Sequence, residues 1–330
     1  MAEQKHGEYQ AAKRLIDGAK RILISGHLSP DGDSLGSMLA LAKLLTDAGH
    51  QAFATADLNA LGKPGFLRGV ERMIPVRKLK RQKRFDLFIA VDCGAFDRMP
   101  PEVRPVAEKL PKICIDHHVT HETFADVTIV DPSAAAAGEL VWRLAKWNEW
   151  PIDEEIAEAL WVALITDSGR FAYDSTSPRT LRAAGDLIKH GVRSSYLNDV
   201  IYGSFSRKTI ELKRLAWRSL RVWKNRKVAE VTLRRDDFRA VRGTKADAED
   251  IIEIPRSVAG NEIALFFYEI PDRTKETRCS IRTRGNWDAT ALAAKFGGGG
   301  HRRAAGCTIK APIIKAKRMM RDAVKEMLRK

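Results

Sequence analysis

The feature that most constrains the fold is a series of short apolar runs that alternate with helical patterns in the first half of the chain. Each run has the length of a single strand. The strand-like runs are residues 21–25, 51–55, 86–92, 112–116 and 127–131. Apolar residues recur at helical spacing over residues 34–49, 134–147 and 156–167. This order predicts an α/β fold with a mostly parallel, doubly wound sheet covered by helices on both faces.

The sequence changes character beyond about residue 190. A basic stretch over 204–227 has a helical pattern, and alternating runs at 227–233, 262–270 and 277–284 predict the strands of a smaller α+β unit. We therefore expect a first domain over residues 1–190, a helical linker over 191–225 and a second domain over 226–330.

The composition indicates the cellular location, the state of the cysteines and the charge of the binding partners. No run of about 18 apolar residues is present, and the first residues lack the basic-then-apolar order of a signal peptide, so we expect a cytoplasmic protein. The cysteines form no CxxC pair, which predicts reduced, buried thiols at Cys93, Cys114, Cys279 and Cys307. The net charge of +15 favours polyanionic partners, although surplus lysine also keeps a surface soluble.

Aspartate and histidine gather where the predicted strands and one helix end. Because functional residues of an open α/β sheet lie beyond the carboxyl ends of its strands, we expect these side chains to converge. They are His27, Asp31, Asp33, Asp92, Asp116, His117, His118 and Asp167.

Several carboxylates brought together repel one another unless a cation lies between them, and two divalent ions resolve that conflict. Asp and His ligands without a thiolate favour Mn²⁺. Gly32 permits a sharp turn that aims Asp31 and Asp33 at different ions. In the alternative interpretation Asp33 and Ser34 merely cap a helix, which leaves His27 and the "DHH" run unexplained.

Four motifs carry a family resemblance, namely "GHLSPDGDSLGS" (26–37), "VDCGAFDRM" (91–99), "IDHHVT" (115–120) and "TDSGRF" (166–171). In this order and spacing they resemble the motifs of the DHH phosphoesterases, in the RecJ-like branch. Further on, "SIRTRG" (280–285) and "FGGGGHRRAAG" (296–306) resemble the DHH-associated C-terminal domain. The resemblance spans roughly residues 20–310. It implies that 1–190 is a metal-binding catalytic domain and 226–330 a substrate-binding domain.

The resemblance also implies a role for each matched residue. Ligands of a first metal are expected at His27 and Asp31, and a bridging carboxylate at Asp92. Ligands of a second metal are expected at Asp33, His117 and Asp167. His118 is expected to contact the substrate phosphate or assist proton transfer, and Asp116 to orient a histidine.

The second domain is expected to hold the nucleotide and to close onto the metal-binding domain. Four consecutive glycines expose backbone N–H groups that can cradle a phosphate. Such a run alone favours a flexible turn, but its position before "HRRAAG" in a basic domain favours the cradle. The expected substrate-binding residues are Arg282, Gly298, Gly299, Gly300 and His301.

The length and the two domains resemble the short oligoribonucleases that degrade nanoRNA, some of which also dephosphorylate 3′-phosphoadenosine 5′-phosphate. We therefore expect a phosphoesterase with two Mn²⁺ ions, for which Mg²⁺ or Co²⁺ can substitute, acting on short single-stranded RNA or small nucleotides. The alternatives are a cyclic or linear dinucleotide phosphodiesterase, a manganese pyrophosphatase and a non-catalytic RNA-binding module. A homodimer through the first domain is compatible with this interpretation.

Overall fold

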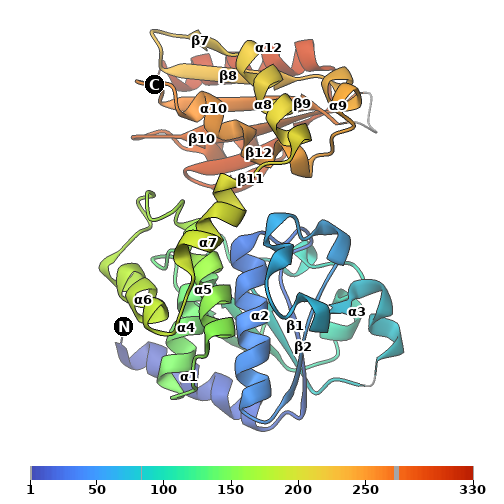
Figure 1. The fold of residues 1–330 in the computed structure, drawn as a ribbon, viewed down its shortest axis with the longest axis vertical. Coiled ribbons are helices and arrows are strands. Elements are labelled where there is room, and N and C mark those ends of the chain that lie inside the picture. The colour runs from blue at the N-terminus through green and yellow to red at the C-terminus, as the bar shows by residue number, and fades with distance from the viewer. Residues whose placement is uncertain (1, 83, 271–274, 330) are drawn as a thin grey trace. The chain divides into compact units, whose positions relative to one another are not determined.

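The computed structural model describes residues 2–82, 84–270 and 275–329. The chain forms two compact units, Met1–Gly203 and Ser204–Lys330. Each unit has its own sheet and its own buried core, so the two are described separately (Figure 1).

The first unit is built on a six-stranded sheet in which every neighbouring pair of strands is parallel. The strand order is β3-β2-β1-β4-β5-β6. The strands are β1 (Arg21–Ser25), β2 (Gln51–Ala56), β3 (Ile74–Pro75), β4 (Leu87–Val91), β5 (Lys112–Asp116) and β6 (Val127–Val130). All five residues of β4 are buried, as expected for a central strand covered on both faces. The predicted parallel α/β fold is confirmed, and only the two-residue strand β3 was not predicted.

Helices cover both faces of this sheet unequally (Figure 1). Ile22 and Ile24 of β1 point into the larger core with long helices, whereas Leu23 points to the opposite face, covered by short helical turns. The helices of this unit are α1 (Ala2–Asp17), α2 (Gly32–Asp47), α3 (Arg104–Ala107), α4 (Ala137–Trp147), α5 (Glu154–Asp167), α6 (Pro178–Lys189) and α7 (Ser194–Asn198).

Helices α2 and α5 pack unusually closely. A Cβ atom added to Gly36 of α2 would lie 2.3 Å from the backbone oxygen of Ala159 in α5. Only glycine allows the two helices to approach this far. The close packing matters for the site because α2 carries Asp33 in its first turn and α5 ends at Asp167.

The second unit has a six-stranded sheet of order β11-β12-β10-β9-β8-β7, antiparallel except for the parallel pair β8 and β9. Its strands are β7 (Arg221–Trp223), β8 (Val228–Leu233), β9 (Ile263–Glu269), β10 (Thr277–Thr283), β11 (Gly299–His301) and β12 (Ala304–Ile309). One face packs on α8 (Arg207–Arg218), α9 (Arg235–Val241) and α10 (Glu253–Arg256). The other face packs on α11 (Ala289–Ala294) and α12 (Ile313–Met327).

The segment expected to be a helical linker, 191–225, is divided between the units. Residues up to Gly203, including α7 and the π-helical turn Asp199–Gly203, lie in the first unit. Helix α8 belongs to the second unit because Leu212 and Ala216 are fully buried against its sheet. The apolar face of this basic helix is therefore a core surface of the second unit.

Candidate metal centre

The eight Asp and His residues singled out in the sequence lie at the carboxyl edge of the first sheet. His27 and Asp31 follow β1, Asp92 follows β4, and Asp116 is the last residue of β5. Asp33 lies in the first turn of α2, and Asp167 is the last residue of α5. His117 and His118 follow β5.

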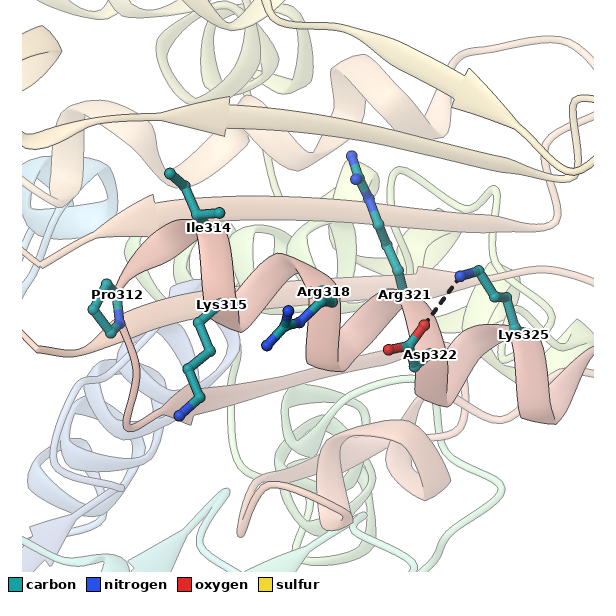
Figure 2. Close-up of a pocket in the computed structure, with 7 residues that line it drawn as sticks. All are labelled: Pro312, Ile314, Lys315, Arg318, Arg321, Asp322 and Lys325. Carbon is teal, nitrogen blue, oxygen red and sulfur yellow. Dashed lines mark hydrogen bonds and ion pairs between the residues drawn. The ribbon is translucent and has the colours of Figure 1, made fainter.

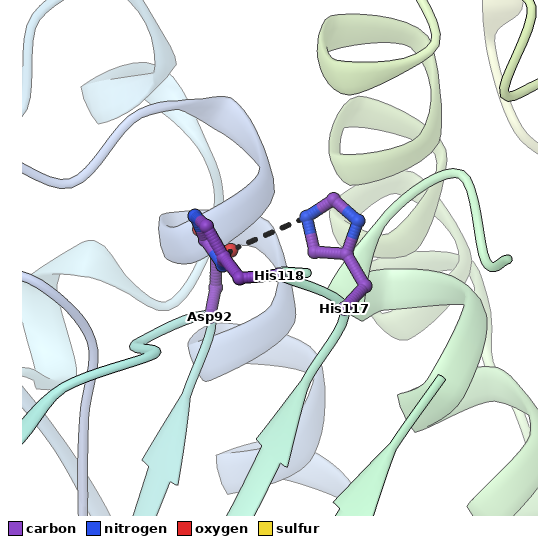
Figure 3. A group of neighbouring side chains, drawn as sticks. All are labelled: Asp92, His117 and His118. Carbon is purple, nitrogen blue, oxygen red and sulfur yellow. Dashed lines mark ion pairs between the residues drawn. The ribbon is translucent and has the colours of Figure 1, made fainter. Parts of the chain in front are cut away.

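Three overlapping groups of these side chains could each hold a metal ion. In each group the potential ligand atoms lie within 4.8 Å of one another. The groups are His27, Asp31 and Asp92; Asp33, His117 and Asp167; and Asp92, His117 and His118. Asp92 belongs to two of them, and in Figure 3 a dashed line marks the ion pair between its carboxylate and His117.

The two carboxylate oxygens of Asp92 face different histidines. Oδ2 lies 3.5 Å from Nε2 of His27, and Oδ1 lies 3.5 Å from Nε2 of His117. The backbone of Asp92 has a φ of 53°, which is rare for a residue with a side chain. Its N–H donates to the Ile115 carbonyl at 2.9 Å, which fixes this turn at the end of β4. The strained turn holds the carboxylate between two sets of ligands.

Asp31 and Asp33 have different backbone partners. Asp31 is the N-cap of α2, and its Oδ1 accepts the N–H groups of Asp33 and Ser34 at 3.0 Å each. Asp33 instead accepts the N–H groups of Ala137 at 2.7 Å and Gly138 at 2.9 Å. These groups belong to the first turn of α4, where the helix dipole stabilises an anion. The alternative that Asp33 caps its own helix is therefore wrong, because Asp31 performs that role.

His117 is oriented by the loop before α4. Its Nδ1 lies 3.3 Å from the Ala134 carbonyl, so an Nδ1–H donates there and Nε2 is left to face the carboxylates. Nε2 lies 3.3 Å from Asp167 and 3.5 Å from each of Asp33 and Asp92.

Asp116 is fully buried and organises two other histidines. Its Oδ1 lies 2.7 Å from Nδ1 of His118, and its Oδ2 lies 3.2 Å from Nδ1 of His121. His121 was not among the predicted site residues, although "DHHVTH" shows a third histidine in the same segment. The arrangement leaves Nε2 of His118 directed away from Asp116.

A buried network that was not predicted from the sequence supports the loop before α4. Glu139 is fully buried and accepts hydrogen bonds from Ala135 N at 3.2 Å and Thr180 Oγ1 at 2.8 Å. Arg143 forms ion pairs with Glu139 and, at 2.8 Å, with Asp131 at the end of β6. The network anchors the backbone that donates to Asp33 and accepts from His117.

The electrostatics of the centre fit a divalent cation. Burial, followed by the charge of Asp92, raises the pKa of Asp33 well above its usual value. Burial also raises the pKa of Asp167 to about 7. Burial opposes charge on His117 as well, but Asp92, Asp167 and Asp33 raise the pKa of its ring well above the usual value. Protons on these three groups thus reduce the repulsion between the clustered carboxylates, and a divalent cation can take the same role. The oxygen and nitrogen ligand atoms of the centre suit Mn²⁺.

The expected substrate-binding glycines lie at the start of the edge strand β11 of the second unit, with Gly298 directly before it. A Cβ on Gly298 would lie 2.3 Å from the Gly306 carbonyl oxygen, and one on Gly300, whose φ is 143°, would lie 2.5 Å from the Ala304 oxygen. These two glycines are therefore required for the close approach of β11 to β12. Around Gly299 the space is open. The side chain of His301 lies outside the described part of the chain.

Arg282 lies in β10, next to β12, where its register partner is Ala304. Its Nη1 donates to the carbonyl of Ile281 at 3.1 Å.

All four cysteines are free and buried, as predicted. Among the helices of the described residues, none has the length and apolar character needed to cross a membrane.

Comparisons with known proteins agree with this architecture. The model of the DHH family, N-terminal domain, matches residues 21–164, and the model of the DHHA1 domain matches residues 239–330. The bifunctional oligoribonuclease and PAP phosphatase NrnA of Thermus thermophilus is 31% identical over 318 residues, which cover 93% of this chain and 90% of that protein. The chain belongs to the DHH family. As a member it is a metal-dependent hydrolase.

Two solved structures share the fold. An exopolyphosphatase-related protein from Bacteroides fragilis superimposes with a TM-score of 0.88 at 24% identity, covering 97% of this chain and 96% of that one. RecJ from Thermus thermophilus, solved in complex with Mn²⁺, has a TM-score of 0.52 at 15% identity and covers 98% of this chain and 54% of that one.

Proposed function

We propose that this protein hydrolyses short oligoribonucleotides to mononucleotides and removes the 3′-phosphate of 3′-phosphoadenosine 5′-phosphate, using two Mn²⁺ ions. The observation that carries the proposal is the carboxylate of Asp92, with one oxygen facing His27 and the other facing His117. The relative from Thermus thermophilus, with both activities in its name, supports the choice of substrates.

The residues divide into two ligand sets that share Asp92. We assign His27, Asp31 and Asp92 to the first ion. We assign Asp33, Asp92, His117 and Asp167 to the second ion. Manganese suits these mixed carboxylate and imidazole ligands, and the RecJ structure solved with Mn²⁺ supports the same choice.

When bound, paired metals activate water and stabilise the charge that develops on a phosphoryl group. The chain's own residues supply position and proton control. The Asp31 side chain is 52% exposed, whereas Asp33 and Asp92 are buried, so the centre opens to solvent on the side of Asp31. A phosphate therefore approaches from that side.

His118 is suited to meet the substrate. Asp116 orients the ring through Nδ1 at 2.7 Å, which turns Nε2 away from Asp116, and we assign to Nε2 the donation of a proton to a phosphate oxygen. His121 contacts the other carboxylate oxygen of Asp116 and so helps to hold Asp116 in the position from which it orients His118. We assign the grip on the remainder of the nucleotide to Arg282, the glycines of β11 and His301.

The experiment that tests the proposal is chromatographic product analysis with Mn²⁺. One preparation is offered 5′-phosphorylated RNA of two to five nucleotides, 3′-phosphoadenosine 5′-phosphate and cyclic dinucleotides. We expect mononucleotides from the RNA and adenosine 5′-phosphate from the second substrate. Turnover confined to the cyclic or two-nucleotide substrates would refute the proposed specificity.

A variant of the second unit tests its role in binding the nucleotide. His301→Ala is expected to raise KM for nucleotides while leaving hydrolysis of bis-p-nitrophenyl phosphate nearly unchanged. An equal loss on both substrates would contradict the assignment of this residue to nucleotide binding.

A further inference from the structure

The positive charge of the protein belongs entirely to the second unit. Residues 204–330 contain 31 lysines and arginines against 15 acidic residues, a net charge of +16. Residues 1–203 contain 26 against 27, a net charge of −1. A general solubilising surplus would be spread over both units. The division points instead to a polyanion that the second unit binds.

The cations of this unit include a row on the outer face of α12 (Figure 2). They border a hollow of about 480 Å³, here called the α12 groove. Its lining residues are Pro312, Ile314, Lys315, Arg318, Arg321, Asp322 and Lys325. Four cations and a single carboxylate thus surround one depression.

The positive charge of the α12 groove is only partly neutralised. Lys315 and Arg318 are exposed and form no ion pair or hydrogen bond within the described part of the chain. Lys325 pairs with Asp322 at 3.0 Å. Arg321 pairs with Glu230, a fully buried carboxylate on β8.

Glu230 binds two cations of α12 and therefore neutralises only part of the positive charge at the α12 groove. The single carboxylate is shared by Arg321 and by Lys317, which lies 3.0 Å away. Arg221, an exposed residue of the edge strand β7, is the register partner of Glu230 and extends the basic surface beyond the helix. Lys315 and Arg318 therefore remain available for an external anion.

The spacing of the cations suits an extended chain of phosphates. Lys315, Arg318, Arg321 and Lys325 lie at intervals of three or four residues, so they share one helix face. From Lys315 to Lys325 the helix rises about 15 Å, the length of about four stacked nucleotides at about 3.4 Å each. Guanidinium groups match phosphate oxygens in pairs.

The apolar content of the groove argues against a lipid surface. Ile314, 77% exposed, is its only large aliphatic side chain, which is too little for insertion but suits contact with a nucleobase. We propose that the α12 groove binds the phosphate backbone of single-stranded RNA, as a contact additional to the β11 glycines and the metal centre. The choice of RNA rests on the proposed function.

The test compares two double variants that remove equal charge. Lys315→Ala with Arg318→Ala removes the two unpaired cations of the groove. Arg207→Ala with Lys208→Ala removes two exposed cations at the start of α8, on the opposite face of the sheet. Binding of a fluorescein-labelled 12-nucleotide RNA is followed by anisotropy in EDTA, which prevents cleavage, from 50 to 200 mM salt.

The groove variant is expected to show a less steep fall of log affinity with log salt, with a slope about 1.4 less negative, about 0.7 for each phosphate that is no longer neutralised. Raising salt from 50 to 200 mM then weakens its binding about sevenfold less than that of the wild type. The α8 variant is expected to retain the wild-type slope. An unchanged slope in the groove variant, or equal changes in both variants, would overturn the proposal. So would equally tight, competing binding of a polyglutamate peptide.

Hydrolysis of a dinucleotide with Mn²⁺ separates this proposal from the proposed function. The groove variant should hydrolyse it at the wild-type rate, because the single internucleotide phosphate of a dinucleotide is the one that the metal centre takes. Absence of dinucleotide hydrolysis in the wild type would defeat the proposed function, whereas the salt slopes would still decide the RNA contact.

Discussion

Replacing Gly36 with alanine tests whether the close packing of α2 against α5 is essential. The new Cβ would lie 2.3 Å from the Ala159 carbonyl oxygen, about 1 Å inside the 3.4–4 Å of ordinary contact. The oxygen belongs to the backbone of a buried helix, so it cannot rotate away. Overpacking of this kind costs about 1–3 kcal/mol, and we place the cost near the upper limit.

The helix preference of alanine partly offsets the cost of this overpacking. Alanine favours a helix by about 1 kcal/mol over glycine, so the expected net loss is about 2 kcal/mol. For a unit of 203 residues, about 2–4 °C of Tm correspond to each kcal/mol, which gives a decrease of about 4–8 °C. Because α2 carries Asp33 and α5 carries Asp167, we expect weaker Mn²⁺ binding in addition.

Gly185 of α6 provides the matched control. It is an exposed helical glycine, and a Cβ there would meet nothing within 4 Å. Gly185→Ala should therefore raise Tm by about 2–4 °C. Differential scanning calorimetry of the full chain measures both, with the first unit identified as the transition that Mn²⁺ shifts. The reasoning is refuted if Gly36→Ala raises Tm as Gly185→Ala does.

Three further outcomes follow from the structure. Asp92→Ala should abolish Mn²⁺-dependent hydrolysis of every substrate, since both proposed ligand sets lose a member; near-normal turnover would exclude the bridging role. Metal removal with EDTA should lower the Tm of the first unit only, by about 5–11 °C relative to Mn²⁺ at one hundred times its Kd, and a Tm unaffected by Mn²⁺ would argue against the centre. Ion pairs with Arg321 and Lys317 outweigh burial and lower the pKa of Glu230, so its stabilising contribution is present above its unfolded pKa and is lost as pH falls through the folded pKa. Glu230→Gln should accordingly be much less stable than the wild type at pH 7 in urea unfolding, with the difference shrinking below about pH 4; a constant difference would contradict this.

The location of the site could be predicted from the sequence because its residues follow strands directly. Parallel strands all end at one edge, so Asp92 and His117 were expected to meet although 25 residues separate them. Strand positions require only local apolar runs. The alternation over the first half of the chain was therefore sufficient for both the fold and the edge where the site lies.

The partners of each ligand could not be predicted in this way. Asp33 accepts hydrogen bonds from Ala137 and Gly138, more than one hundred residues away, and no local pattern indicates that contact. Glu139 resembles any acidic residue in the first turn of a helix until Arg143 and Thr180 are placed beside it. Such contacts depend on how α4 and α6 pack, which a single sequence does not specify.

The glycine motif of the second unit shows the same limit. The sequence predicted a phosphate cradle because four glycines expose backbone N–H groups. Gly298 and Gly300 have a packing reason as well, since any side chain would collide with β12. Gly299 has open space around it. Unlike at Gly298 and Gly300, packing therefore does not explain why this position has no side chain.

Three side chains of the centre are oriented in the same way. Each of three residues uses one atom to contact the rest of the chain and leaves its second atom directed elsewhere. Asp31 binds the start of α2 through Oδ1, His117 faces Ala134 through Nδ1, and His118 faces Asp116 through Nδ1. The side chains are thus oriented before any metal arrives, and their mutual repulsion is left for the cation to relieve. A change to an orienting contact should therefore weaken metal binding even where every ligand remains.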